Sequence, residues 1–465
     1  MAAANTPAQA CKIDDQSGAL PGPHSIWPLA TVSAFRRDPL GFLRENARVY
    51  GDLVHFRLGP RHAYQLNHPD LVRDLLITDS ASHHRGPLMQ RARTVLGDGL
   101  LTSEEPLHAQ QRRFIQPAFH RDRILEYARP MLECANELSR SWLDEDEADG
   151  GLIVDIHDVM SQLTLAIVGK SLFGVGFEQD AKRITRAAAE LMAVVKLIFW
   201  PFSRLLMELP IPSMIRFHRA RKDLDQVIRK LIGQRAKDSA NRNNLLSALL
   251  ASRGPQAPIE GEELVRQVRD EVLTLVLAGH ETVANALTYA FVLLARNPAV
   301  AVRMREEIEA VARDEDIAPG HFEKLVFTRA VLAESMRLYP PAWVLARTAK
   351  ASYTLQGHTI PKGSILFASQ YVLHRDPRFF VDPEEFRPER FVNPVHPRFA
   401  YFPFGAGPRQ CIGEGFAWME GVLVLAVLWR TWDFELLLRE GPALDPAVTL
   451  RTRGPVPMRV RKTSC

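Results

Sequence analysis

One cysteine stands in a glycine-rich segment that could hold a metal-bound sulfur. The segment is FGAGPRQCIG, residues 404–413, and it leads from a β-prone run at 399–403 into an apolar helical pattern at 416–429. Unpaired amide N–H groups and the positive dipole end of a helix N-terminus favour an anion. We therefore expect Cys411 to be a thiolate, the form of cysteine that binds metal. The glycines allow the backbone to approach a flat ligand closely.

A second set of polar residues interrupts an apolar helix. Helical periodicity runs from Glu260 to Asn297 and stops at Pro298, and its middle, residues 272–277, is apolar enough to predict burial. The sequence AGHET follows at 278–282. Its threonine can bond a carbonyl one turn back and open a local bulge, and its glycine leaves space beside the backbone. A zinc-protease motif is excluded, because His-Glu-x-x-His would need histidine at Ala284.

Both segments resemble motifs of the cytochrome P-450 superfamily. The heme-loop pattern Phe-x-x-Gly-x-Arg-x-Cys-x-Gly matches residues 404–413, and the oxygen-binding pattern Ala-Gly-x-[Asp/Glu]-Thr matches residues 278–282. The resemblance implies that Cys411 is the axial ligand of the iron of heme b (iron protoporphyrin IX). It also implies that Thr282 supports dioxygen at the heme and that Glu281 helps to deliver protons. Phe404 and Gly279 are then expected to contact the heme.

Four basic residues are candidates for the heme propionates. The segment 104–120 predicts a short basic helix in which His108 and Arg112 share a face. The family has a Trp-x-x-x-Arg pair here, so the chain departs from it at His108. The resemblance also assigns Arg347 and Arg409 to this role, and arginine suits carboxylates because its planar fork binds them bidentately. A solvated basic face is the alternative for the first pair.

A further helix at 323–338 contains Glu334 and Arg337, which lie three residues apart and can pair on one face. Alone, such a pair is usually a surface salt bridge of little energetic consequence. The segment FRPERF at 386–391 completes the family pattern, which implies a buried network of Glu334, Arg337 and Arg390. These three residues are expected to be structural.

The segments that would form a substrate pocket are almost wholly apolar. They comprise Leu100 and Leu101, a 187–217 stretch that resembles the family's lid, a helix face with Leu275 and Ala278, and the loop with Trp343, Val344 and Leu345. This composition favours a neutral, hydrophobic small molecule. Two of these stretches are similar to those of bacterial members that oxidise sesquiterpenes, which suggests a terpene. Fatty acids and steroids remain alternatives.

Composition and periodicity predict a mainly α protein. The 465 residues are 46% hydrophobic and 24% charged, as in ordinary globular proteins. We expect a flexible segment at 1–22 and one α-rich domain at 23–465, with small β-sheets and the heme between a long central helix and the cysteine loop. Strands are predicted at 54–58, 62–66 and 353–355. Four cysteines without a Cys-x-x-Cys pair exclude a disulfide framework.

The charge and the ends of the chain lead to expectations about partners. A net charge of +4 gives no reason to expect nucleic acid. The first 25 residues contain no apolar run long enough for a signal peptide or membrane anchor, so a cytoplasmic protein is expected. We also expect a monomer. The 54 residues after Cys411 are too few for a fused flavin reductase. Electrons are therefore expected from a separate ferredoxin and ferredoxin reductase. The ferredoxin would dock on a basic patch of this chain that includes the exposed residues among arginines 112, 113, 387, 390 and 409.

Two other functions compete with a monooxygenase that hydroxylates a C–H bond. A peroxide-driven fatty-acid hydroxylase shares the heme loop but typically lacks the acid and alcohol that Glu281 and Thr282 supply. A non-catalytic heme sensor could also use Cys411, although a sensor needs no proton delivery. Both alternatives stay open at the level of sequence.

Overall fold

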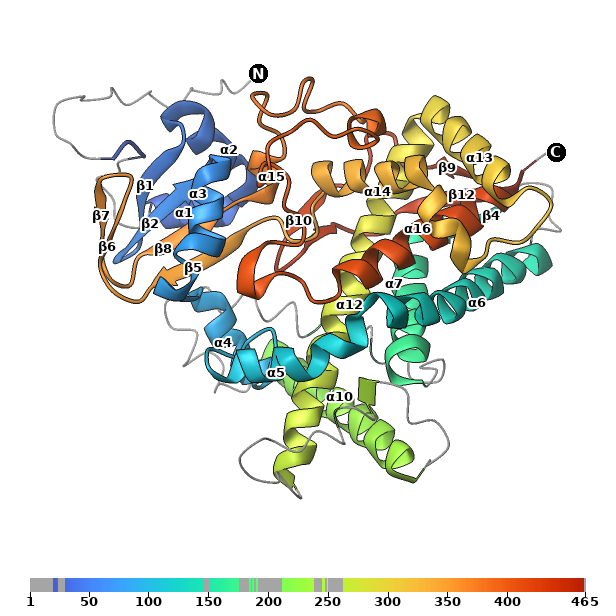
Figure 1. Cartoon of the computed structure of the whole chain (residues 1–465), viewed down its shortest axis with the longest axis horizontal. Coiled ribbons are helices and arrows are strands. Elements are labelled where there is room, and N and C mark those ends of the chain that lie inside the picture. The colour runs from blue at the N-terminus through green and yellow to red at the C-terminus, as the bar shows by residue number, and fades with distance from the viewer. Residues whose placement is uncertain are drawn as a thin grey trace.

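The computed structural model describes residues 20–23, 30–145, 151–174, 211–237 and 262–463, with seven isolated helical residues between 184 and 249. Helices form most of it, and four small sheets lie around them, as the sequence predicts (Figure 1). The predicted 187–217 lid lies mostly outside the described residues. In the part of the chain that is described, no helix is long and apolar enough to cross a membrane.

A β-rich region forms one end of the molecule (left in Figure 1). Its five-stranded sheet has the order β1-β2-β8-β5-β3. The predicted pair of strands around Gly59 is present as the antiparallel β1 and β2, with Leu53 opposite Leu66. The elements of this region are α1 (Ala30–Arg37), α2 (Pro39–Tyr50), β1 (Leu53–Leu58), β2 (Arg61–Leu66), α3 (Pro69–Arg73), β3 (His83–Arg85), β5 (Leu345–Ala349), β8 (Ile365–Ala368) and α15 (Gln370–Leu373).

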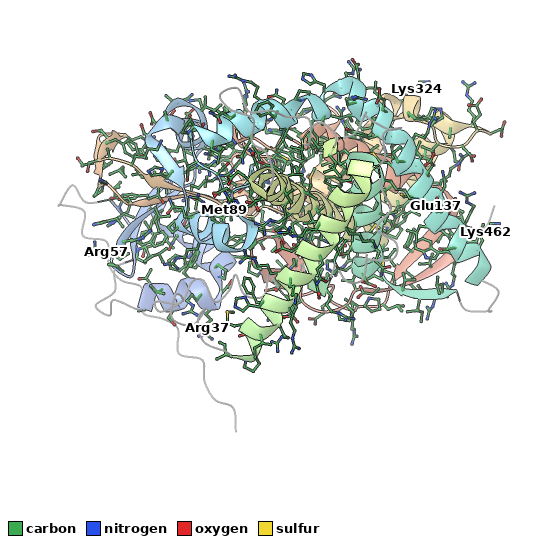
Figure 2. The ribbon with its side chains drawn as sticks, turned by 90° about the horizontal axis from the view of Figure 1, so that it is seen from below. Arg37, Arg57, Met89, Glu137, Lys324 and Lys462 are labelled. Carbon is green, nitrogen blue, oxygen red and sulfur yellow. The ribbon has the colours of Figure 1, made fainter. Side chains whose placement is uncertain are left out.

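The rest of the molecule is mainly helical and surrounds α12 (Glu262–Arg296), which extends from beside α10 into the centre (Figure 1). α12 packs against α7, α10, α14 and α16. Figure 2 views the molecule from the side on which α10 crosses in front and Met89 marks α4. The remaining helices are α4 (Pro87–Leu96), α5 (Leu107–Ile115), α6 (Arg121–Glu145), α7 (Ile156–Val168), α10 (Pro212–Lys237), α13 (Pro298–Ala312), α14 (Val326–Leu338) and α16 (Glu414–Thr431).

Three smaller sheets complete the fold. One is three-stranded, with β12 between β4 and β9, and the other two are the hairpins β6-β7 and β10-β11. The predicted strand at 353–355 is β6. The bounds are β4 (Leu152–Asp155), β6 (Tyr353–Leu355), β7 (His358–Ile360), β9 (Trp432–Leu436), β10 (Leu444–Pro446), β11 (Leu450–Thr452) and β12 (Pro457–Lys462).

Local sequence explains where the two helices of the candidate site begin and end. α12 is buried at every residue from 272 to 277, as its apolar run predicts, and it stops before Pro298, which is the first residue of α13. A proline at the first helical position costs no hydrogen bond. α16 begins directly after the cysteine loop, with Gly413 as its N-cap, and residues 421–429 are buried in the main core.

Candidate active site

The cysteine loop has a backbone that only glycine permits at one position. Cys411 N–H donates to the Phe404 carbonyl at 2.9 Å, which closes the loop. Gly405 and Gly407 have φ of +70° and +71°. A Cβ on Gly407 would lie 2.1 Å from the Leu76 carbonyl oxygen, so a side chain cannot be accommodated there. Phe404 packs on the indole of Trp418, with ring centroids 5.6 Å apart.

Cys411 is an exposed residue, although many protein atoms lie around its sulfur. A backbone hydrogen bond from Gly413 lowers its pKa, but burial has the larger effect and raises the pKa to about 11. Burial thus opposes ionisation of this side chain when no metal is bound, and the thiolate stays a prediction for the metal-bound protein. A bound metal ion ionises a coordinating thiol outright.

The AGHET segment lies in an unbroken part of α12. Thr282 Oγ1 donates to the Ala278 carbonyl at 2.6 Å, as expected, yet the helix continues without the predicted bulge. Ala278 is exposed between the buried stretches 272–277 and 283–294, and Gly279 is half-buried. A Cβ on Gly279 would lie 3.1 Å from a Val168 methyl group, so α7 packs closely at this glycine. One short stretch of a buried helix thus remains accessible.

Glu281 is held by the β10-β11 hairpin. Thr449 Oγ1 donates to Glu281 Oε1 at 2.5 Å, and Arg451 Nε lies 3.9 Å from the same oxygen. Arg451 Nη2 also lies 3.4 Å from the Asp445 carboxylate. The Glu281 carboxylate is therefore positioned by residues more than 160 positions away in sequence. Neither Thr449 nor Arg451 belongs to a motif, so sequence reasoning does not find them.

Three arginines converge near the cysteine loop, and Arg85 is one that the sequence analysis missed. Arg85 of β3 and Arg347 of β5 are cross-strand partners in an antiparallel pair. Burial, then Arg347 and Arg409, lower the pKa of Arg85 to about 9, and burial and Arg409 lower the pKa of Arg347 to about 10. These shifts indicate enclosed positive charges that repel one another.

Glu104 is the carboxylate that these arginines share. It accepts the Arg85 backbone N–H at 2.7 Å and lies 3.3 Å from Arg409 Nη2. Arg409 Nη1 donates to the Ser103 carbonyl at 2.7 Å, whereas Arg347 Nη1 bonds only the Ala346 carbonyl at 3.0 Å. Among the described residues, Arg85 Nε has no hydrogen-bond partner. The cluster of Arg85, Arg347 and Arg409 therefore holds more positive charge than its neighbours neutralise.

The predicted basic helix is α5, and its two candidate residues differ in environment. His108 is buried and its ring hydrogen bonds Glu105 Oε1 at 2.8 Å. Burial, followed by the charge of Arg409, lowers the pKa of His108 to about 4, so its ring is neutral. Arg112 Nη1 donates to the Gln410 carbonyl at 2.8 Å, which ties α5 to the residue before Cys411.

The structure brings Glu334, Arg337 and Arg390 together. Arg337 Nε and Nη2 donate to the two carboxylate oxygens of Glu334 at 2.7 and 2.9 Å, and Arg390 Nε donates to Glu334 Oε1 at 2.9 Å. Glu334 and Arg337 are fully buried. Arg337 also donates to three backbone carbonyls, those of His374, Pro383 and Glu385.

The expected pocket residues separate into two groups. Leu275 and Ala278 lie on α12, and a methyl group of Leu345 approaches the cysteine loop, 3.5 Å from where a Cβ of Gly405 would be. Trp343 and Val344 pack instead with the core of the β-rich region, and Trp343 Nε1 donates to the Ala447 carbonyl at 3.0 Å. Leu345 is thus the residue of this loop that reaches toward the cysteine.

Three observations fit a heme between α12 and the cysteine loop. Cys411 is exposed, and Ala278 is an exposed residue between buried stretches of α12. Gly407 lets the loop lie flat against Leu76. The unneutralised arginine cluster matches a ligand that carries carboxylates. A donor set of one thiolate with surrounding arginines is that of a thiolate-ligated heme protein.

Comparison with known proteins identifies the family. The family model described as Cytochrome P450 matches residues 20–455, so the chain belongs to this family and is a monooxygenase with a heme-thiolate cofactor. It is 35% identical to cyclooctatin synthase and 34% identical to cyclooctat-9-en-7-ol 5-monooxygenase, both of Streptomyces melanosporofaciens. These alignments cover 91% and 90% of this chain and 91% and 89% of the relatives. Pentalenene oxygenase of Streptomyces avermitilis is 32% identical, over 89% of this chain and 90% of its own length.

Proposed function

We propose that this monooxygenase hydroxylates a cyclic terpene, with Cys411 as the axial ligand of heme b. The observation that carries the proposal is the exposed Cys411 in a glycine loop that starts a helix. The substrate class is supported by the relatives named above, of which one is an oxygenase of pentalenene and another a monooxygenase of cyclooctat-9-en-7-ol. The described candidate pocket residues, Leu100, Leu275 and Leu345, are apolar.

The residues around the cysteine would hold and tune the cofactor. The Gly413 N–H group that bonds the sulfur would stabilise its negative charge. Arg85, Arg347 and Arg409 would bind the propionates, with Arg112 beside them and His108 as a neutral neighbour. When bound, a thiolate-ligated heme supplies oxygen activation, because the sulfur donates electron density that favours O–O cleavage.

Residues of α12 would manage protons and water. Thr282 holds its hydroxyl hydrogen on the Ala278 carbonyl, so the hydroxyl oxygen remains free to accept a hydrogen bond, for example from a water molecule. Glu281 would take protons from the outside by way of the Thr449 hydroxyl and the partly exposed Asp445, with Arg451 holding the two carboxylates near each other.

The first experiment is the visible spectrum of the reduced, carbon-monoxide-bound protein, with Cys411→Ser alongside. A strongly red-shifted Soret band in the wild type that is absent from the variant is the expected result. A band at the position typical of imidazole or thiol ligation would contradict Cys411 as a thiolate ligand. Turnover with peroxide alone, at the rate reached with redox partners, would instead favour the peroxide-driven hydroxylase.

Substrate binding is tested with pentalenene, cyclooctat-9-en-7-ol and lauric acid as probes. We expect at least one of the two terpenes to displace the water ligand and shift the Soret band, and lauric acid to leave it unchanged. A shift with lauric acid and none with either terpene would contradict the substrate class.

We further propose that a separate ferredoxin, itself reduced by a ferredoxin reductase, docks beside α5. Of the five arginines expected to form the patch, Arg390 and Arg409 are largely buried in ion pairs, and Arg387 pairs with Asp382 at 2.7 Å. Arg113 is exposed and Arg112 is half-buried. An acidic partner would meet this face by charge complementarity.

Charge reversal in Arg113→Glu should slow reduction by an acidic ferredoxin about tenfold at low salt, and less at high salt. Arg266→Glu, an exposed arginine on α12, is the matched control and should leave the rate unchanged. Equal rates of reduction for the wild type and Arg113→Glu at low salt would contradict docking at this face.

A further inference from the structure

Two adjacent carboxyl groups are buried near the N-terminal half of α12, and the proposed function uses neither of them. Asp270 is 5% exposed and Glu271 is 2% exposed. Buried carboxyl groups are costly unless they are hydrogen-bonded or paired. The partners of these two therefore show what the carboxyl groups are for.

Both carboxyl groups hold the segment 97–101 that follows α4. Asp98 N–H donates to Asp270 Oδ2 at 2.9 Å, and Leu100 N–H donates to Glu271 Oε2 at 2.9 Å. Two alternate backbone amides of the same segment thus bond two successive residues of α12. The segment itself has no other secondary structure to satisfy these amides.

Glycines allow the segment to lie directly on the helix. A Cβ on Gly97, which has φ of +70°, would lie 2.1 Å from the Asp270 carboxylate. A Cβ on Gly99 would lie 2.2 Å from Thr274 Oγ1. Larger residues at either position would push the segment away from α12. Both hydrogen bonds from the backbone amides of Asp98 and Leu100 would then be lost.

The same cluster reaches α10. Arg269 Nη2 lies 2.7 Å from Asp270 Oδ1, and Arg269 Nη1 donates to Asp225 of α10 at 3.0 Å. Figure 2, seen from below, shows α10 crossing in front of the molecule. One ion-pair cluster therefore joins three segments, namely 97–101, α12 and α10.

We infer that Asp270 and Glu271 act as a clasp that fixes residues 97–101 on α12 and so positions one wall of the substrate pocket. Glu271 is seven residues before Ala278 and eleven before Thr282, spacings that place all three on one stripe of an α-helix. Along the axis, Glu271 and Ala278 are about 10 Å apart. The wall that Leu100 and Leu101 would form would thus lie about 10 Å along the helix axis from Ala278. This distance is roughly the size of the ring system of a cyclic terpene. This reading rests on the proposed function for the identity of the pocket.

The clasp responds to pH through Glu271. Burial raises the pKa of Glu271 to about 7, the Leu100 N–H group opposes this, and the charge of Asp270 adds to it. The other charged groups of the cluster are Arg269, Asp225 of α10, and Asp98 with its partner Arg93 of α4. Burial under the docked segment disfavours the ionised carboxylate more than the Leu100 N–H group stabilises it, so raising the pH from about 5 to 7 favours release of the segment.

Amide hydrogen exchange of the heme-loaded protein, without substrate, tests the clasp directly. In Glu271→Leu the Leu100 amide loses its acceptor, and exchange in the peptide that covers 97–103 should accelerate about tenfold or more. Glu271→Gln keeps an amide oxygen as the acceptor and should restore slow exchange. The same variant should also remove the pH dependence of protection between pH 5 and 7. Glu263→Gln, an exposed carboxyl group on the same helix, is the matched control and should not change exchange.

Turnover of the terpene that binds provides the second readout. Glu271→Leu should raise KM about tenfold and change kcat less than about threefold, because a displaced wall weakens binding more than it changes the oxygen site. Unchanged exchange in Glu271→Leu would overturn the clasp. Faster exchange with unchanged KM would overturn its role in the pocket. If no terpene binds at all, the proposed function fails while the exchange result still decides on the clasp.

Discussion

Two clusters of enclosed arginines in this molecule differ in how completely their guanidinium groups are hydrogen-bonded and paired. The first contains Arg337 and Arg390 with Glu334. The second contains Arg85, Arg347 and Arg409, and in it only Arg409 forms ion pairs among the described residues, with the partly exposed Glu104 and Glu105. The two clusters contain the same types of side chain. The contrast therefore separates an arrangement made for stability from one made for a ligand.

The first cluster is complete without any other molecule. Each carboxylate oxygen of Glu334 accepts from Arg337, and one of them also accepts from Arg390 and from the Arg387 backbone N–H. Arg337 donates its remaining bonds to backbone carbonyls. A buried network of this kind fixes the relative positions of α14 and the segment 381–391.

The second cluster is incomplete. Arg347 donates to one backbone carbonyl, Arg85 Nε has no partner in the described part of the chain, and both arginines have a lowered pKa because of burial and mutual repulsion. Positive charges held together at such a cost indicate a negatively charged ligand. The proposed propionate contacts would neutralise them.

The largest expected effect comes from breaking the complete cluster. Glu334→Gln removes the one carboxylate and leaves Arg337 and Arg390 charged and enclosed. Breaking a buried pair by removing one partner should lower the free energy of unfolding by about 3–5 kcal/mol. Urea unfolding of the apoprotein and of the heme-loaded protein would measure it, and the loss should be equal in both.

The control for Glu334→Gln is Glu263→Gln, which breaks an exposed pair with Arg266 on α12. It should leave the unfolding transition unchanged within error. A loss confined to the heme-loaded form of Glu334→Gln would contradict the comparison, because this network would then serve the ligand rather than the fold.

The second prediction concerns the incomplete cluster, where a substitution should not lower the free energy of unfolding of the apoprotein. Arg85→Met removes one repelling charge from the incomplete cluster, so the free energy of unfolding of the apoprotein should stay the same or rise by up to about 2 kcal/mol. The heme-loaded form should lose a charge-assisted contact, and heme affinity should fall about tenfold or more. Heme transfer to apomyoglobin measures the affinity.

Arg266→Met, which removes an exposed arginine, should change neither quantity. If Arg85→Met destabilised the apoprotein by several kcal/mol and left heme transfer unchanged, Arg85 would belong with the complete cluster. The comparison between the two clusters would then fail.

The complete cluster could be predicted from sequence, whereas the incomplete one could be predicted only in part. Glu334 and Arg337 lie one helical turn apart, so local spacing indicates the pair. Arg409 is in the cysteine motif. Arg85 follows two histidines in a short strand without a motif, and only the non-local pairing of β3 with β5 places it beside Arg347. Long-range strand pairing is not encoded in spacing along the chain.

The same limit applies to single residues of the candidate pocket and site. The apolar run of α12 was correctly predicted to be buried, but the acceptor role of Glu271 depends on Leu100, 171 positions away. Trp343 is expected in the pocket from its neighbours in sequence, and its side chain packs with the core of the β-rich region. Proximity to a motif in sequence does not determine the direction of a side chain.

The smallest expected effect is a change in the pKa of a histidine. One histidine lies beside each cluster and reports on its charge. His108 lies beside Arg409, and burial together with this charge lowers its pKa to about 4. His374 lies beside Arg337 in the complete cluster, where burial, Arg337 and Arg375 hold its pKa well below the usual value. Both rings are neutral at pH 7, so unloaded protein gives no contrast between them.

Loading with diamagnetic zinc protoporphyrin should separate the two reporters. Carboxylates that neutralise the incomplete cluster reduce the positive potential at His108, so its pKa should rise by about one unit. The pKa of His374 should not change, because nothing is added to the complete cluster. Proton and nitrogen chemical shifts of the two rings, titrated from pH 7 down to the acid unfolding limit, measure both values. Equal shifts in the two histidines would mean that the ligand acts through the whole fold, and a shift in His374 alone would reverse the assignment of the two clusters.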